Sequence, residues 1–166
     1  MKHIKIGLYG RTSGIDNIGK LKTLIEILQT KAVLYIYEPF SAYLQEQFDM
    51  AIECERFSST KDISGDLTCL LSVGGDGTFL EASQFAVEHG IPILGINFGR
   101  LGFLAQVPAN EIEPALDNLF EHNYTIEKRS LISVYRDGDH DFISTALNEV
   151  TIHRNDLTMI KTTVKV

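Results

Sequence analysis

The chain has 166 residues, 44% of them hydrophobic and 22% charged, which is ordinary for a globular domain large enough to bury a core. Its formal net charge of −7 argues against a general nucleic-acid binder, because such proteins present a basic face. No apolar stretch is long enough to span a bilayer, no signal peptide is visible, and Cys54 and Cys69 fit no zinc or disulfide spacing, so the sequence predicts a cytoplasmic protein.

The chain begins with alternating strand and helix patterns. His3–Tyr9 predicts a first strand, and the apolar residues from Ile18 to Leu28 recur at helical spacing. Val33–Tyr37 is β-branched and aromatic, which predicts a second strand. Ser41–Met50 then predicts a short helix. This part of the chain therefore reads as strand, helix, strand, helix.

The same alternation continues through the middle of the chain. Thr68–Val73 is a short apolar run that stops at glycines, as strands buried on both faces of a parallel sheet do. Phe79–His89 predicts a helix that ends at Gly90, and Ile91–Ile96 predicts the next strand. A last helix is predicted with Asn110 as its N-cap. These patterns together indicate the α/β class, with a Rossmann-like, open, doubly wound parallel sheet.

The pattern changes near residue 125. Thr125–Arg136 and Asp141–Arg154 predict two antiparallel strands, because the Asp-Gly pair between them favours a hairpin. Ile160–Val166 alternates apolar and polar residues as a further strand and reaches the end of the chain without a turn, which predicts a truncated sheet. We therefore expect an α/β nucleotide-binding domain followed by the beginning of an antiparallel, β-rich dinucleotide-binding domain, over residues 1–124 and 125–166.

A glycine-rich segment, Gly74–Thr78, lies between a predicted buried strand and a predicted helix. Open α/β sheets bind ligands at such turns, and glycines let backbone N–H groups approach phosphate oxygens. Asp76 is the predicted catalytic residue, because a carboxylate there can accept the proton of an alcohol during phosphoryl transfer. A simple tight turn is the alternative interpretation. The residues predicted to bind phosphate are Gly74, Gly75, Gly77 and Thr78.

Gly74–Thr78 resembles the phosphate-binding motif shared by NAD kinases, diacylglycerol and sphingosine kinases, and 6-phosphofructokinases. Two further segments narrow the resemblance to NAD kinases: Asn97–Leu104 (Asn-Phe-Gly-Arg-Leu-Gly-Phe-Leu) and Leu147–Val150 (Leu-Asn-Glu-Val). The resemblance covers essentially the whole chain. NAD kinases run nearly twice as long, however, and their Gly-Ser-Thr-Ala-Tyr-type segment is absent from this sequence.

The resemblance implies an enzyme that transfers the γ-phosphoryl group of ATP to the 2′-hydroxyl of the adenosine ribose of NAD, giving NADP. Mg²⁺ or another divalent ion would arrive with ATP, and no tightly held metal site is expected. Small nucleotides are the expected partners, without nucleic acid or membrane. The full-length enzyme is expected to be a homo-oligomer, since an open sheet needs a partner surface. The residues implied to bind NAD are Asp76, Gly77, Phe103, Asn148 and Glu149.

Several alternatives stay open at this point. A lipid or sugar kinase shares the glycine motif, and a truncated chain fits an inactive or non-catalytic nucleotide-binding fragment. Polyphosphate as donor and NADH as acceptor are further alternatives. Gly14–Lys20 matches most of a P-loop, but Leu21 stands where a Mg²⁺-binding Ser or Thr belongs. Arg11 follows the first strand and is expected to be an exposed loop arginine, with contact to ATP phosphates as the alternative.

Overall fold

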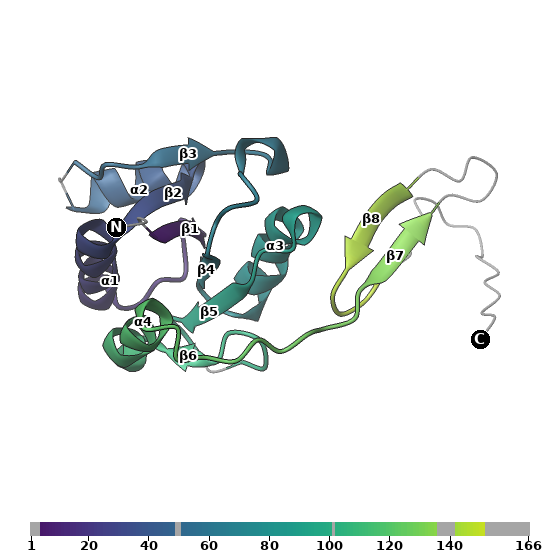
Figure 1. Cartoon of the computed structure of the whole chain (residues 1–166). Helices are drawn as coiled ribbons and strands as arrows, with labels where there is room; N and C mark the ends of the chain where they lie inside the picture. Colours follow the sequence, from purple (N-terminus) through teal and green to yellow (C-terminus); the bar gives the residue numbers. More distant parts are fainter. Residues whose placement is uncertain (1–3, 49–50, 101, 136–141, 152–166) are drawn as a thin grey trace, which may run out of the picture. The chain divides into compact units, whose positions relative to one another are not determined.

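The computed structural model describes residues 4–48, 51–100, 102–135 and 142–151 (Figure 1). Contacts within the chain divide it into two compact units, residues 1–127 and 128–166. Within the described ranges no helix has both the length and the apolar character needed to cross a membrane.

A six-stranded, entirely parallel sheet forms the centre of the first unit, in the order β3-β2-β1-β4-β5-β6 (Figure 1). The chain builds outward from β1 to β3 on one side and then from β4 to β6 on the other. This is the strand order of doubly wound α/β folds, which confirms the predicted class. The strands are β1 (Ile4–Gly10), β2 (Ala32–Tyr37), β3 (Glu55–Phe57), β4 (Cys69–Val73), β5 (Ile93–Asn97) and β6 (Val107–Pro108).

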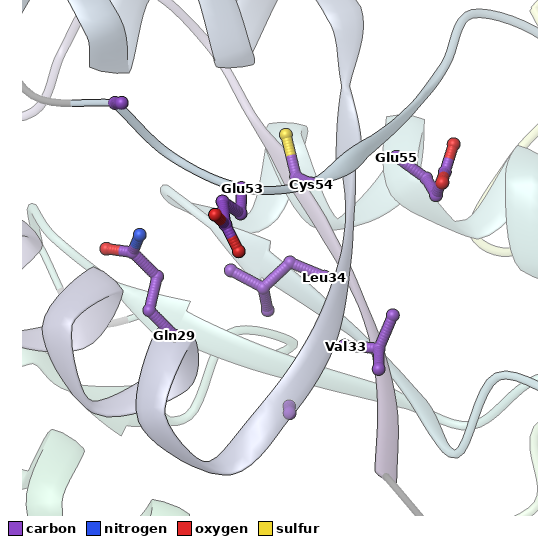
Figure 2. A pocket seen from close by; sticks show the side chains of 8 residues that line it. Gln29, Val33, Leu34, Glu53, Cys54 and Glu55 are labelled. Atoms are coloured by element: carbon purple, nitrogen blue, oxygen red, sulfur yellow. The ribbon is translucent and has the colours of Figure 1, made fainter.

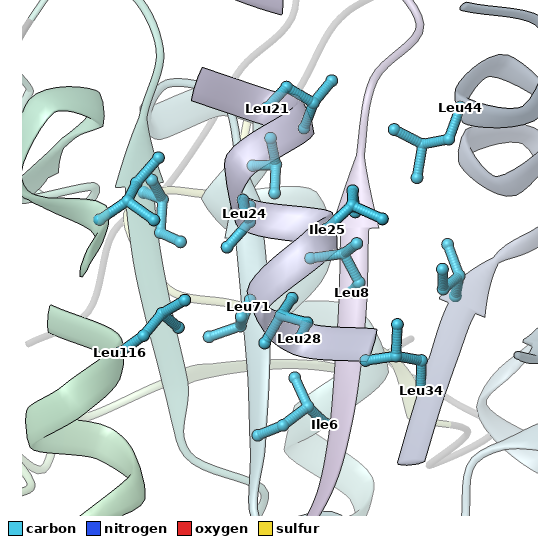
Figure 3. Packing of buried hydrophobic residues seen from close by; sticks show 14 of the residues in the cluster. Ile6, Leu8, Leu21, Leu24, Ile25, Leu28, Leu34, Leu44, Leu71 and Leu116 are labelled. Carbon is cyan, nitrogen blue, oxygen red and sulfur yellow. The ribbon is translucent and has the colours of Figure 1, made fainter. Parts of the chain in front are cut away.

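Helices cover both faces of this sheet. Helices α1, α2 and α4 contribute to one hydrophobic core, whereas α3 contributes to the core on the opposite face. Figure 3 shows the first core, in which the apolar stripe of α1 lies over the strands; the labelled side chains of that stripe are Leu21, Leu24, Ile25 and Leu28. The helices are α1 (Ile18–Lys31), α2 (Glu38–Phe48), α3 (Asp76–Ala86) and α4 (Ile112–Phe120).

The alternation of side chains along each strand explains the two cores. Leu8 of β1 points to the α1 face, and its neighbour Tyr9 packs in the α3 core. In β4, Leu71 and Leu70 divide in the same way. Every residue of β4 is buried because helices cover it on both sides, which is why its sequence reads as an unbroken apolar run.

Two helix starts differ from the sequence predictions. Helix α3 begins at Asp76 rather than Phe79, so most of the glycine segment forms its first turn. Asn110 is not the N-cap of α4; it lies in a 3-10 turn, Ala109–Glu111, that runs directly into that helix. Gly90 follows in a left-handed conformation, as predicted, with φ of 63°, but α3 itself ends at Ala86 and Val87–His89 forms a 3-10 helix.

The second unit contains an antiparallel pair, β7 (Ile132–Tyr135) and β8 (Phe142–Ala146), with a register irregularity between Val134 and Tyr135. Both strands are shorter than predicted, because residues 125–131 are irregular and β8 ends at Ala146. The predicted turn at residues 137–140 and the predicted strand at residues 160–166 lie outside the described residues.

Candidate functional site

Two loops meet at the carboxyl edge of the sheet. Strand β4 pairs with β5 in parallel, with Val73 opposite Ile96, so the segments that follow the two strands leave the sheet side by side. The backbone N–H of Gly74 still donates to the carbonyl of Ile96, at 3.0 Å. The predicted phosphate loop, Gly74–Thr78, therefore starts next to the second predicted segment, Asn97–Leu104.

Gly74 makes the sharp turn from β4 into α3. Its φ is +150°, and a Cβ there would lie 2.3 Å from Oγ1 of Thr78, which is itself 5% exposed. Nothing lies within 4 Å of a Cβ built on Gly75, and Gly77 is exposed. Gly75 and Gly77 thus place no side chain of their own over the first turn of α3, an arrangement that suits a phosphate.

Asp76 joins the two loops through its carboxylate. Its Oδ2 accepts the backbone N–H of Phe103 at 2.8 Å, and its Oδ1 accepts those of Leu104 and Ala105, both at 3.0 Å. These hydrogen bonds, the one from Ala105 foremost, hold the pKa of the Asp76 carboxyl below its usual value. The side chain is therefore a carboxylate at neutral pH.

Asn97 gives the second loop its shape from inside. It is 3% exposed, and its Nδ2 donates to the carbonyls of Arg100 at 2.9 Å and Ala105 at 3.2 Å. Its Oδ1 accepts the N–H of Gly99 at 2.9 Å. The buried side-chain amide of Asn97 thus bonds to both ends of the loop. The sequence analysis assigned no role to this residue.

Phe103 lies at the outer end of this loop with its side chain in solvent. It is 89% exposed, although its backbone N–H is fixed by Asp76. A phenyl ring held out of the core in this way carries no packing role, and aromatic faces stack well on flat bases. The structure thus brings Asp76, Gly77 and Phe103, three of the predicted NAD-binding residues, to one place.

Across the phosphate loop lies a polar cluster formed by Arg11, Glu81 and Tyr9. Arg11 donates from Nε to Oε2 of Glu81 at 2.9 Å and from Nη2 to Oε1, and the Tyr9 hydroxyl donates to Oε2 at 3.1 Å. The Arg11 side chain is 51% exposed. Arg11 is therefore exposed, as expected, but it is also fixed in place by α3.

Asn148 and Glu149, the other predicted NAD-binding residues, belong to the second unit. They follow β8, with Asn148 in a bend and Glu149 directly after it, and both are exposed. The prediction that they lie within a strand is wrong, because β8 ends two residues earlier. Past a strand end, adjacent side chains need not point to opposite faces, so the pair is able to serve one ligand.

An open pocket of about 530 Å³ lies elsewhere on the first unit (Figure 2). It is lined by residues at the beginnings of β2 and β3 and by neighbouring positions, among them Gln29, Val33, Glu53 and Cys54. The beginnings of parallel strands lie at the opposite edge of the sheet from the glycine loop. This pocket is therefore not part of the candidate site.

Comparison with known proteins identifies a family over most of the first unit. Residues 21–124 match the model of the ATP-NAD kinase N-terminal domain. This segment contains both glycine loops, from β4 through the Asn97–Leu104 segment.

Individual relatives extend the similarity to nearly the whole chain. An NAD kinase of Flavobacterium psychrophilum is 40% identical over 165 residues, covering 98% of this chain and 55% of the relative. An NAD kinase of Hydrogenovibrio crunogenus is 37% identical over 156 residues, covering 92% and 52%. A crystal structure of yeast NADH kinase complexed with NADH has the same fold, with a TM-score of 0.70 at 16% identity, over 88% of this chain and 47% of the yeast chain. The chain thus spans about half the length of these relatives.

Proposed function

This chain belongs to the NAD kinase family, and from that premise we propose that the protein transfers the γ-phosphoryl group of ATP to the 2′-hydroxyl of the adenosine ribose of NAD. The observation that carries the proposal is the link between the Asp76 carboxylate and the backbone of Phe103–Ala105. It holds a carboxylate and an exposed aromatic ring beside a glycine loop suited to phosphate.

The proposed reaction uses each of these parts. The ring of Phe103 stacks on the adenine of NAD, and the ribose 2′-hydroxyl lies at Asp76, next to the backbone of Gly77. Backbone N–H groups of Gly75, Gly77 and Thr78 hold the phosphates of ATP, and Gly74, whose own N–H donates to Ile96, contributes the turn that presents them. The 2′-oxygen forms a bond to Pγ, the bond between Pγ and the β–γ bridging oxygen breaks, and ADP leaves with the electron pair.

Asp76 takes the proton of the 2′-hydroxyl in this scheme. Its Oδ2 accepts one backbone N–H and its Oδ1 accepts two, so Oδ2 retains more capacity to accept the hydroxyl. Because the amides lower the pKa of Asp76, its carboxylate is ionised at neutral pH. The same lowering makes it a weak base. Asp76 therefore orients the hydroxyl first and accepts its proton late in the transfer.

Mg²⁺ bound to ATP fits these residues as part of the substrate. The described residues contain no group of three or more His, Cys, Asp or Glu side chains placed to hold an ion. Mg²⁺ that arrives with nucleotide phosphates needs only one or two protein carboxylates, and it neutralises charge on the transferred group.

The second unit and the cellular setting belong to the same proposal. We propose that residues 1–124 form the nucleotide-binding domain and that residues 125–166 begin a β-rich dinucleotide-binding domain, in which Asn148 and Glu149 contact NAD. The division of contacts after residue 127 supports this boundary. The enzyme would act as a cytoplasmic homo-oligomer on free nucleotides, without nucleic acid or membrane; the net charge of −7 supports the exclusion of nucleic acid.

The test is NADP formation from ATP, Mg²⁺ and NAD, followed with an NADP-specific dehydrogenase. It uses the 166-residue chain and a hybrid enzyme, in which this chain replaces the matching half of the Flavobacterium psychrophilum NAD kinase. We expect NADP from the hybrid enzyme, and a large loss in its Asp76→Asn variant. The matched control is Asp16→Asn, at an exposed aspartate that precedes α1.

Each outcome has a distinct meaning. No NADP from a folded hybrid, with phosphorylation of a lipid or a sugar phosphate instead, would replace the NAD kinase proposal by the other kinases that share the glycine motif. Near-normal turnover of the folded Asp76→Asn hybrid would remove Asp76 from the mechanism. NADP from the hybrid alone would mean that the 166-residue chain is insufficient for activity.

A further inference from the structure

The guanidinium of Arg11 lies against the first turn of α3. A Cβ built on Gly77 would be 3.8 Å from both Nη1 and Nη2 of Arg11. Glu81, four residues after Gly77 and so on the same side of the helix, holds Nε and Nη2. In the described part of the chain Nη1 has no hydrogen-bond acceptor, so its donors face the space beside Gly77.

This cluster lies where the sheet reverses its direction of building. Gly10, at the end of β1, pairs with Val73, at the end of β4, so Arg11 and Gly74 leave neighbouring strands. After β1 the chain continues to α1 on one face, and after β4 it continues to α3 on the other. The divergence of two such connections opens the crevice in which doubly wound sheets bind their ligands.

We propose that Arg11 binds the phosphates of the ATP donor, and that Glu81, supported by Tyr9, is a positioning residue that holds the Arg11 guanidinium beside Gly77. The proposal rests on the NAD kinase function proposed above and adds a residue to its donor site. Arginine suits this role because its planar group offers several N–H donors in a fixed geometry to phosphate oxygens.

The phosphate donor, ATP, and the acceptor, NAD, would lie on different sides of the glycine loop. Asp76 turns toward the loop that follows β5, whereas Gly77 faces Arg11 in the loop that follows β1. Strands β5 and β1 flank β4 on opposite sides. The hydroxyl that reacts at Asp76 and the phosphate chain that reaches Arg11 would thus approach the loop from opposite sides, as transfer between two substrates requires.

Glu81 has a structural reason to be present in a phosphate site. An exposed arginine samples many rotamers, and holding it in one of them before ATP binds lowers the entropic cost of binding. The Arg11 hydrogen bonds lower the pKa of the Glu81 carboxyl, so the pair stays ionised at neutral pH. Nε and Nη2 of Arg11 donate to Glu81, which leaves Nη1 to donate to the phosphates.

The experiment compares Arg11→Gln, Arg11→Lys and Glu81→Gln in the hybrid enzyme, with separate measurements of KM for ATP, KM for NAD and kcat. Calorimetric titration of the 166-residue chain and the hybrid with Mg²⁺–ATP supplies a readout that does not depend on turnover. Arg56→Gln is the matched control, because Arg56 is an exposed arginine on β3, separated from β1 by β2.

We expect Arg11→Gln to raise KM for ATP about 10- to 100-fold, the range for a lost hydrogen bond to a charged group, with KM for NAD changed less than about twofold. Arg11→Lys should lose less, since it keeps the charge, and Glu81→Gln should raise KM for ATP with kcat nearly unchanged. Unchanged affinity for ATP in Arg11→Gln, in a hybrid that makes NADP, would overturn this inference alone. A hybrid that neither binds ATP nor makes NADP would overturn both proposals.

Discussion

Gly102 and Asp76 are in contact across the two glycine-rich loops, and the contact leaves no room for a side chain on Gly102. A Cβ built there would lie 2.2 Å from Oδ1 of Asp76. The closeness follows from the three backbone N–H groups at residues 103–105 that converge on the same carboxylate. Gly102 is therefore a determinant of where Asp76 points.

We expect Gly102→Ala to displace the Asp76 carboxylate, because the added methyl group would overlap the carboxylate atoms. The hydrogen bonds to residues 103–105 would weaken, at a cost of about 1 kcal/mol in unfolding free energy for a partly exposed carboxylate. Turnover of the hybrid enzyme should fall about 100-fold, since displacing a catalytic group by about 1 Å can slow a reaction by that factor. Denaturant unfolding and NADP formation measure the two quantities.

The control is Gly99→Ala, in the same loop. The nearest atom to a Cβ on Gly99 is Oδ1 of Asn97, at 4.0 Å, and Gly99 is exposed. This variant should keep both stability and turnover. Equal losses in the two variants would show that the loop, rather than the contact with Asp76, is what the substitution disturbs.

Gly74 and Gly75 are adjacent, but only Gly74 has a backbone conformation and surroundings that exclude a side chain. Gly74→Ala should lower the unfolding free energy by about 1–3 kcal/mol for the strained φ alone, and the approach of Thr78 Oγ1 to 2.3 Å adds to the cost. Gly75→Ala should leave stability nearly unchanged, because nothing lies within 4 Å of its added Cβ. Thermal unfolding of the two variants tests the contrast; similar melting temperatures would contradict it.

The exposed ring of Phe103 should matter for NAD and not for folding. Phe103→Ala is expected to change the unfolding free energy by less than about 0.5 kcal/mol, as surface substitutions do. Loss of stacking on adenine should raise KM for NAD about 5- to 100-fold, and Phe103→Tyr should restore it. A reduced melting temperature in Phe103→Ala, with KM for NAD unchanged, would assign the ring to packing instead.

The stability that Asp76 contributes should depend on pH in a defined direction. Its folded pKa is lowered by the amides of Ala105, Phe103 and Leu104, so the contribution is complete above the unfolded value of about 3.9. It is lost as pH falls through the folded pKa. The difference in unfolding free energy between the wild type and Asp76→Asn should therefore be constant from pH 8 to 5 and shrink below about pH 4. A difference that grows on acidification would contradict the assignment.

The sequence by itself determined the class of the fold and the place of the glycine loop. Thr68–Val73 is apolar throughout because β4 is covered on both faces, and that signal is local and strong. The short edge strands β3 and β6 escaped prediction, since three and two residues are too few to show a period. The start of α3 was placed three residues late, because glycines there suggest a loop although they open the helix.

Only the tertiary structure decided how the parts of the site meet. Asp76 and Ala105 are 29 residues apart, and nothing in their local sequence shows that a carboxylate and a backbone amide will bond. Arg11 and Glu81 are 70 residues apart, and each alone reads as an ordinary surface charge. Sequence periodicity records which side of one strand or helix is buried, whereas the pairing of β4 with β1 and β5 sets which loops become neighbours. The residue types of the site are thus local information, and their juxtaposition is a property of strand order.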